Sequence, residues 1–187
     1  PRSFDVSRRK LTRGTAERLK LKVEAVITHA QLTDTLADSK RKTLDLKGSV
    51  DLAVDLGATV VTFHMGGPAE DKEKRQEAWR RVVESLKDSL EYAESKRVYL
   101  ASDGIWPEWI IDTPESFLKL CDEVGSTYLG VNFDPCYLTL MGLDPVAVAR
   151  KWKGRIVHGH LKDHVGMYPK WKHRIPGQGE MDYDRVV

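Results

Sequence analysis

The sequence predicts an α/β fold, a partial (β/α)8 barrel with about five of the eight strand–helix units. Short β-branched runs alternate with longer amphipathic segments along the chain, which predicts parallel strands joined by helices. A histidine or an aspartate follows each of these runs. In such a barrel the carboxyl ends of the strands carry the functional groups. The pattern therefore predicts both the fold and the place of a site.

The expected strands are short and rich in apolar residues. They cover residues 22–28, 58–63, 98–102, 128–133 and 155–161. The run over 58–63 is almost continuously apolar, as in a strand that is covered on both faces. Right-handed crossovers between parallel strands wind the sheet in one direction. A polar loop is expected after the last strand, through Asp182.

The expected helices have amphipathic periodicity and recognisable end signals. They cover residues 1–18, 39–56, 71–95 and 114–124, with a short one opening at Pro145. Asp38 is an expected N-cap, and Gly57 is an expected stop. Thr113-Pro114 and Asp144-Pro145 each combine an N-cap with a proline at the first helical position.

Length and composition fit a single domain over residues 1–187. The chain is 41% hydrophobic and 31% charged, with a net charge of +2. This near-balance gives no electrostatic case for a nucleic acid partner. The sequence contains no apolar run of about 18 residues, so it does not predict a membrane partner. Cys121 and Cys136 form neither a metal pair nor a disulfide framework by spacing, which favours the cytoplasm. A closed barrel takes about 250 residues, so we expect a domain truncated at both ends.

Five imidazole or carboxylate side chains follow the five expected strands. They are His29, His64, Asp103, Asp134 and His160. They lie roughly 26 to 39 residues apart, about one strand–helix unit each, so they converge on one face of a parallel barrel. Two carboxylates with imidazoles suit one divalent ion such as Mn²⁺, Co²⁺, Mg²⁺ or Zn²⁺. An open coordination position could then take a substrate oxygen.

These residues also have structural interpretations. Asp103 alone would be an ordinary helix N-cap, whereas Asp134 precedes Pro135 and an expected loop, where capping is less natural. A histidine at a strand end can be a satisfied polar residue. His158 shares the face of His160, and either lines the site or forms a hydrogen bond inside the barrel. The convergence of all five strand ends favours a site.

Three tryptophans lie in the expected loops after strands, at Trp106, Trp109 and Trp171. Aromatic faces pack well on the C–H surfaces of a sugar ring. The three side chains therefore form either an apolar wall for such a ring or ordinary loop packing.

Several motifs occur in a recognisable order. They are Thr62-Phe-His64-Met-Gly-Gly67, Leu129-Gly-Val-Asn-Phe-Asp134-Pro-Cys-Tyr137, Arg155-Ile-Val-His-Gly-His160-Leu-Lys-Asp163 and Ile175-Pro-Gly-Gln-Gly-Glu-Met-Asp182. Together they resemble the sugar phosphate isomerase/epimerase family of the xylose-isomerase-like TIM barrel superfamily. That superfamily also contains the family 2 apurinic (AP) endonucleases. The resemblance covers residues 21–182, nearly the whole chain.

The resemblance implies a metal-dependent isomerase or epimerase of a sugar or sugar-like polyol ketone, acting by proton transfer through a metal-stabilised enediolate. It implies metal ligands at Asp103, Asp134 and His160, with Asp103 also as a catalytic acid or base. The family usually has Glu where this chain has Asp103, which is one methylene shorter. A further Glu ligand, on the last strand of the family's barrel, lies beyond the sequence given.

The expected partner is a small-molecule sugar, and the resemblance also leaves room for a homo-oligomer. Substrate-binding roles are expected for His29, His64, Lys162, His173 and Arg174. His173 and Arg174 would hold the distal hydroxyl or phosphate, or would be solvated loop charges. Asp163 is expected to orient a neighbouring group rather than to react.

Two alternatives remain open. The first is a zinc phosphodiesterase of the apurinic endonuclease type, which His29, His64, Asp134, His160 and His173 would fit. Tyr137 stands where that family has His, and Trp171 stands where it has Asp, so a three-metal cluster would lose ligands. The second alternative is a truncated or degenerate member without catalysis.

Overall fold

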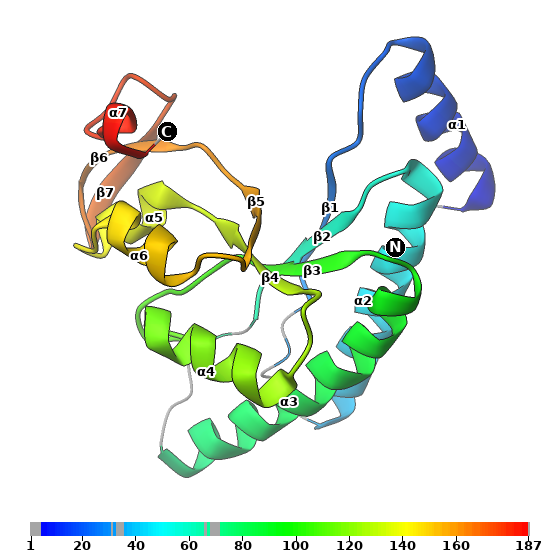
Figure 1. Ribbon diagram of the computed structural model, residues 1–187, viewed down its shortest axis with the longest axis horizontal. Helices are drawn as coiled ribbons and strands as arrows, with labels where there is room; N and C mark the ends of the chain where they lie inside the picture. The colour runs from blue at the N-terminus through cyan, green and yellow to red at the C-terminus, as the bar shows by residue number, and fades with distance from the viewer. Residues whose placement is uncertain (1–4, 31, 33–35, 66, 68–71, 187) are drawn as a thin grey trace.

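The computed structural model describes residues 5–30, 32, 36–65, 67 and 72–186, apart from the side chains of 36–39 and 72–73. Five parallel strands form its centre (Figure 1): β1 (Ala25–Thr28), β2 (Val60–Phe63), β3 (Tyr99–Ser102), β4 (Leu129–Phe133) and β5 (Ile156–Gly159). Their spatial order is their order in the chain. This curved parallel sheet confirms the expected partial (β/α)8 barrel.

The strand registers decide which side chains lie level with one another at the carboxyl edge. Phe63 pairs with Ser102, and Ser102 pairs with Val131. Asp103, which follows Ser102, is therefore level with Asn132 rather than with Asp134. Between β4 and β5 the register shifts after Val131, so that Asn132 pairs with His158.

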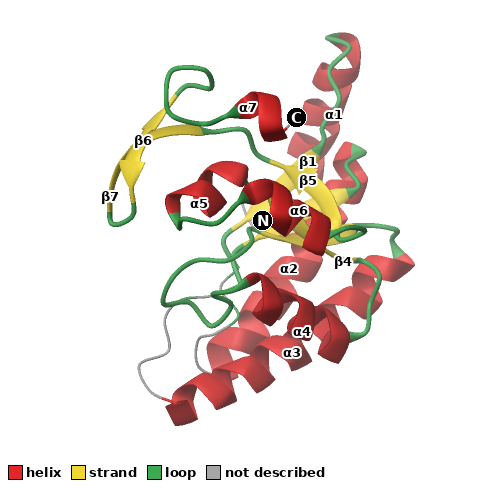
Figure 2. Cartoon of the chain, turned by 60° about the vertical axis from the view of Figure 1, so that its left-hand side comes forward, coloured by secondary structure: helices red, strands yellow, loops and turns green. Residues whose placement is uncertain are grey.

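Three long helices cover one face of the sheet (Figure 2): α2 (Leu36–Leu56), α3 (Lys72–Ser95) and α4 (Pro114–Val124). Their apolar stripes are buried against the strands, and Val82, Leu86 and Leu90 of α3 are at most 1% exposed. Leu100 and Val131 of the sheet meet them and are fully buried. The expected helix start at Asp38 is wrong, because α2 already begins at Leu36. The side chain of Asp38 lies outside the described residues.

The capping signals of α4 are confirmed. Thr113 accepts a hydrogen bond from the backbone N–H of Ser116, Pro114 opens the helix, and Gly125 ends it in the left-handed conformation. The same signal at Asp144-Pro145 opens α6 (Pro145–Lys151). The same signal operates at Asp134-Pro135, where a loop was expected from the sequence. Asp134 caps the short helix α5 (Pro135–Leu140), so the expectation that capping is less natural at Asp134 is wrong.

The expected polar loop after β5 is also wrong in part. Residues Asp163–Met167 (β6) and Lys170–Arg174 (β7) form a separate antiparallel hairpin. The hairpin lies beside α5, away from the long helices (Figures 1 and 2). The chain then returns as a loop and ends in α7 (Tyr183–Val186).

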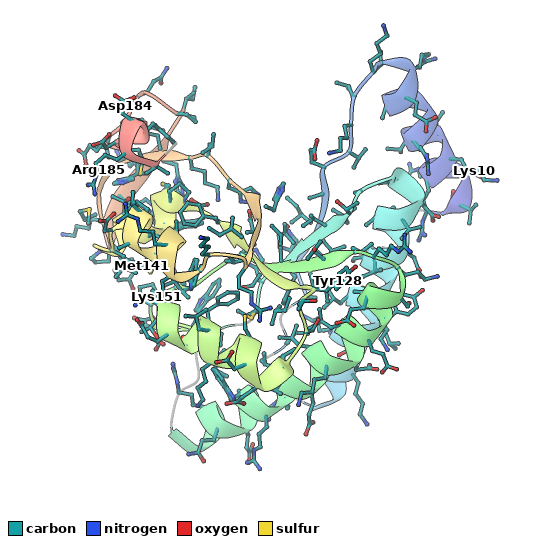
Figure 3. All side chains as sticks on the ribbon, in the orientation of Figure 1. Lys10, Tyr128, Met141, Lys151, Asp184 and Arg185 are labelled. Atoms are coloured by element: carbon teal, nitrogen blue, oxygen red, sulfur yellow. The ribbon has the colours of Figure 1, made fainter. Side chains whose placement is uncertain are left out.

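The first and last described helices, α1 (Val6–Arg18) and α7, lie at opposite edges of the sheet (Figure 1). The helix α1 begins at the N-cap Asp5 and packs on α2, where Arg9 is paired with Asp55 at 2.8 Å. Asp184 and Arg185 of α7 lie beside α6, where Arg185 donates a hydrogen bond to Asp144 Oδ2 at 3.2 Å, and both are far from Lys10 of α1 (Figure 3). In the described part of the chain no helix is long and apolar enough to cross a membrane.

Candidate active site at the strand ends

One buried asparagine joins two of the predicted site residues. The side-chain Nδ2 of Asn132 donates a hydrogen bond to Asp103 Oδ1 at 2.8 Å and lies 3.0 Å from His160 Nδ1. Asn132 is 1% exposed, so its orientation is fixed by the surrounding core. The structure thus brings the ends of β3, β4 and β5 together at one amide group.

Asn132 was not among the residues expected from the sequence. A signal was nevertheless present, because Asn132 stands two positions before Asp134 and side chains at that spacing share one face of a strand. An amide among the apolar residues of a buried strand also needs a polar partner. Its Oδ1 is buried without a hydrogen bond among the described residues.

Asp134 is buried and bonded on both of its carboxylate oxygens. Its Oδ1 accepts the backbone N–H of Tyr137 at 3.3 Å, which caps α5. Its Oδ2 accepts a hydrogen bond from Lys162 Nζ at 2.6 Å and lies 4.0 Å from His160 Nδ1. The ammonium group of Lys162 also lies 4.4 Å from the centre of the Tyr137 ring, as a cation–π contact.

His64 and His29 form the opposite side of the site. Nδ1 of His64 lies 3.2 Å from Asp103 Oδ2, although the two atoms are not aligned as a hydrogen bond. The His64 ring stacks on His29 with centroids 5.4 Å apart and meets the edge of Trp109 at 6.0 Å. His29 is exposed, so this side faces solvent.

Two pKa shifts follow from this crowding. Burial lowers the pKa of His160, and the positive charge of Lys162 lowers it further, while Asp103 and Asp134 oppose the change. For Lys162, burial lowers the pKa, but the hydrogen bond and charge of Asp134 outweigh it, so the pKa of Lys162 is raised. His160 is thus favoured as a neutral imidazole, the form that can donate its nitrogen lone pair to an ion.

An aromatic pocket of about 180 Å³ adjoins the carboxylate Asp103. Its lining comprises His64, Asp103, Ile105, Trp106, Trp109, Tyr137 and Trp171. Trp106 meets the rings of Tyr137 and Trp171 edge to face at 5.2 and 5.6 Å. The three tryptophans named from the sequence therefore converge on the predicted site and are packed against other rings there.

The remaining predicted residues lie further out. His173 on β7 contacts the Tyr137 ring at 5.8 Å but is exposed, as is Arg174, and neither lines the aromatic pocket. His158 is half-buried, and its ring meets His160 at 5.7 Å. The two cysteines are favoured as protonated thiols, which are poor metal ligands. Burial raises the pKa of Cys121 to about 11 and that of Cys136 to about 12.

The donor atoms of the site fit a divalent ion by type, and one pair of them also fits by distance. Two ligands at about 2.1 Å from one ion can be at most about 4.2 Å apart, and Asp134 Oδ2 and His160 Nδ1 are within this limit at 4.0 Å. In the part of the chain that the structure describes, no three carboxylate, imidazole or thiol groups enclose a common point. Instead, Asn132 and Lys162 bond these donor atoms.

The parallel sheet and the polar groups at its carboxyl edge define a class, the barrel proteins that carry their sites at the strand ends. The family model "Xylose isomerase-like TIM barrel" matches residues 3–187. This chain therefore belongs to the xylose isomerase-like TIM barrel family.

The similar proteins carry different names. "Probable endonuclease 4" of Mycobacterium leprae is 25% identical and covers 94% of this chain and 72% of its own length. A D-tagatose 3-epimerase-like protein matches with a TM-score of 0.85 at 19% identity, over 98% of this chain and 71% of that one. The IolI protein, solved with a bound zinc atom, matches with a TM-score of 0.75 at 19% identity, over 93% and 66%. At these identities the two solved structures show the fold alone.

Proposed function

We propose that this chain belongs to a divalent-metal-dependent isomerase or epimerase that acts on a sugar or sugar-like polyol ketone. The observation that carries the proposal is the link from Asp103 through Asn132 to His160, beside an aromatic pocket at the carboxyl edge of the sheet. Polar groups at one end and aromatic walls along the rest suit a small molecule with hydroxyl groups and C–H faces.

The metal would be held by Asp103, Asp134 and His160. Their oxygen and imidazole donors are compatible with Mn²⁺, Co²⁺, Mg²⁺ or Zn²⁺, and the zinc bound by IolI is in keeping with this choice. When bound, the ion would polarise the carbonyl and the neighbouring hydroxyl of the substrate and so acidify the adjacent C–H. The ammonium group of Lys162 is hydrogen-bonded to Asp134. It would either move away from that carboxylate or share it with the ion.

Asp103 is the proposed proton carrier. Asn132 holds its Oδ1 at 2.8 Å, whereas Oδ2 faces His64 and the pocket. Asp103 would remove the substrate proton with Oδ2, and a second acid would return a proton to the opposite face or to a neighbouring carbon. Asn132 keeps the carboxylate from turning, and the Trp106 and Trp109 walls exclude water from the transferred proton.

The other predicted groups would bind the substrate. His64 and His29, stacked on one another, would bind hydroxyl groups next to the reacting carbons. Lys162, within reach of the Asp134 side, would bind an oxygen of the same part of the molecule. His173 and Arg174, on the exposed strand of the hairpin, would meet the distal end. A small-molecule sugar is therefore the proposed partner, and association with a second copy of the chain is left to measurement.

An endonuclease function is the second candidate, because curated relatives carry that name over 94% of this chain. Two residues argue against the endonuclease function. Tyr137 and Trp171 occupy positions where the resemblance expects metal ligands, and both rings line the aromatic pocket. Zinc ligands in proteins are ordinarily Cys, His and carboxylate side chains, so a phenol and an indole at these positions leave a second or third ion short of its usual donors. Nicking of abasic duplex DNA by the zinc-loaded protein at enzymatic rates would favour this candidate over the isomerase.

The test of the proposal is elemental analysis of the purified protein, followed by a sugar screen. About one equivalent of a divalent ion is expected in the wild type, and it should be lost in Asp134→Ala and His160→Ala. Asp144→Ala is the matched control, since Asp144 also caps a helix before a proline but lies away from the site. Equal metal loss in the control, or none in the site variants, would contradict the assignment.

The screen should follow exchange of substrate C–H for solvent deuterium, because every isomerase or epimerase of this type passes a proton. Metal-loaded wild type should exchange one position of an accepted ketose, and Asp103→Asn should slow that exchange at least about 100-fold. Exchange at the same rate in Asp103→Asn would remove Asp103 from the proton-transfer role.

A further inference from the structure

Asp163 is a buried carboxylate that the proposed chemistry does not use. Its side chain is 0% exposed and accepts four backbone N–H groups. Oδ1 accepts from His164 at 2.8 Å and Met181 at 3.1 Å, and Oδ2 accepts from Gly177 and Gly179, both at 2.9 Å. Three of these donors belong to the loop that follows the hairpin. One side chain at the start of β6 therefore fixes the loop that leaves β7.

Further hydrogen bonds close the same junction. The backbone N–H of Glu180 donates to His164 O at 2.8 Å, and Gly166 N–H donates to Glu180 Oε2 at 3.2 Å. The hydroxyl of Tyr183 donates to Lys162 O at 2.5 Å. Hydrogen bonds thus connect the loop to β6, and the hydroxyl of Tyr183 connects the segment after it to Lys162, the partner of Asp134.

Gly179 shows how closely the loop is fitted to this carboxylate. A Cβ atom at this position would collide with Asp163 Oδ1 and with His164 O. Both colliding groups are fixed, one by four hydrogen bonds and the other as backbone. An alanine at 179 would therefore push the loop off Asp163.

The other end of the hairpin rests on the pocket. Tyr168 N–H donates to Leu140 O at 3.2 Å, and the rings of Tyr168 and Trp171 meet Trp106 at 5.5 and 5.6 Å. The outer strand β7 is largely exposed. The pose of Trp171 against Trp106 thus depends on two anchors, the ring contacts at the tip and the Asp163 junction at the base.

We propose that Asp163 is a positioning residue, whose four hydrogen bonds seat the β6–β7 hairpin so that Trp171 closes the aromatic pocket. Calling it a positioning residue for catalysis rests on the proposed function. The seating itself does not, and it can be measured without metal or substrate.

The experiment uses near-ultraviolet circular dichroism, which reports coupled aromatic rings, on variants that disturb the junction from both sides. Asp163→Asn leaves two of the four N–H groups facing an amide N–H instead of an oxygen, and Gly179→Ala displaces the loop. Gly14→Ala is the matched glycine control, because nothing lies within 4 Å of a Cβ there. Far-ultraviolet spectra establish that each variant is folded.

We expect Asp163→Asn and Gly179→Ala to lose most of the near-ultraviolet signal that Trp171→Phe removes, with unchanged far-ultraviolet spectra. In the Trp171→Phe background, either change should alter the remaining signal by less than half as much. A wild-type signal in both variants would overturn the proposal. So would an equal loss with and without Trp171, since that would indicate general loosening rather than hairpin seating.

Metal content separates this inference from the proposed function. Asp163→Asn should keep the ion that Asp134 and His160 hold, if the protein binds one. Loss of the near-ultraviolet signal in a protein that never binds metal would support the seating and contradict only the proposed function.

Discussion

The sheet and the hairpin both supply walls of the same pocket, but they are held in opposite ways. Leu100 and Val131 of the sheet are fully buried apolar residues. In the hairpin the fully buried groups are polar, Asp163 and His164, and most of β7 is exposed. Burial of apolar area stabilises the sheet as part of the whole domain, whereas hydrogen bonds to one carboxylate seat the hairpin. We therefore expect damage to the sheet to be global and damage to the hairpin to be local.

The largest effect should come from the sheet. Leu100→Ala removes a fully buried side chain from the central strand β3 and leaves a cavity, which should lower the free energy of unfolding by about 3 kcal/mol. Urea denaturation followed by far-ultraviolet circular dichroism measures it. A change confined to the hairpin signal, with an unchanged midpoint, would break the comparison.

The next effect should come from the amide that joins the strand ends. Asn132→Ala removes the donor that Asp103 and His160 share and should cost about 1.5 kcal/mol of unfolding free energy. The loss of an oxygen that has no described partner offsets part of the cost. Denaturation at pH 7 measures the change, and stabilisation by the variant would show that the two groups do not need Asn132.

A smaller effect is expected at the hairpin tip. Trp171→Leu deletes the ring contacts with Trp106 and Tyr168, and each pair of this half-buried ring should contribute about 0.5 kcal/mol. Hydrogen exchange should rise in peptides covering 163–183 and stay unchanged in those covering β2 and β3. Increased exchange throughout the sheet would mean that the hairpin is part of the global core.

The smallest effect on the stability of the whole chain should come from the protonation of Asp163 in acid. Burial raises the pKa of Asp163, but its four backbone N–H donors outweigh this and hold the pKa below its ordinary value of 3.8. The charged carboxylate therefore contributes its full stabilisation above pH 3.8, and that contribution is lost as the pH falls through the lower, folded pKa. The near-ultraviolet signal of the hairpin should fall in that range in the wild type. In Asp163→Asn the same transition should be absent.

The sheet could be predicted from the sequence because its strands obey simple rules. Runs such as 58–63 are almost continuously apolar, and a histidine or an aspartate stands at the end of each. Four of the five expected strand ends agree with the observed ones, whereas β5 ends at Gly159, two residues before the expected Leu161. Asp103, Asp134 and His160 do lie near one another. Their roles as ligands remain a prediction.

The hairpin and α5 could not be predicted in the same way. The strands of the hairpin lack apolar alternation, since Lys170, Lys172 and Arg174 face solvent on the outer strand, and a pattern rule takes such a segment for a loop. The helix α5 is only six residues long, too short for periodicity. Its signal was present in Asp134-Pro135, which repeats Asp144-Pro145. The Asp163 junction depends on contacts 14 to 18 residues away, beyond any local signal.

The register shift between β4 and β5 has a consequence for how His160 comes to face the site. Paired residues on neighbouring strands point to the same side of a sheet, and Val157 is passed over between Val131↔Ile156 and Asn132↔His158. Without that one unpaired residue, His160 would have the parity of Pro135 and point to the other face. Gly130 makes room for it, because a Cβ there would collide with Val157. The one-residue shift in register thus determines the face of the sheet to which the His160 imidazole points, and Gly130 on the neighbouring strand leaves the space that the shift needs.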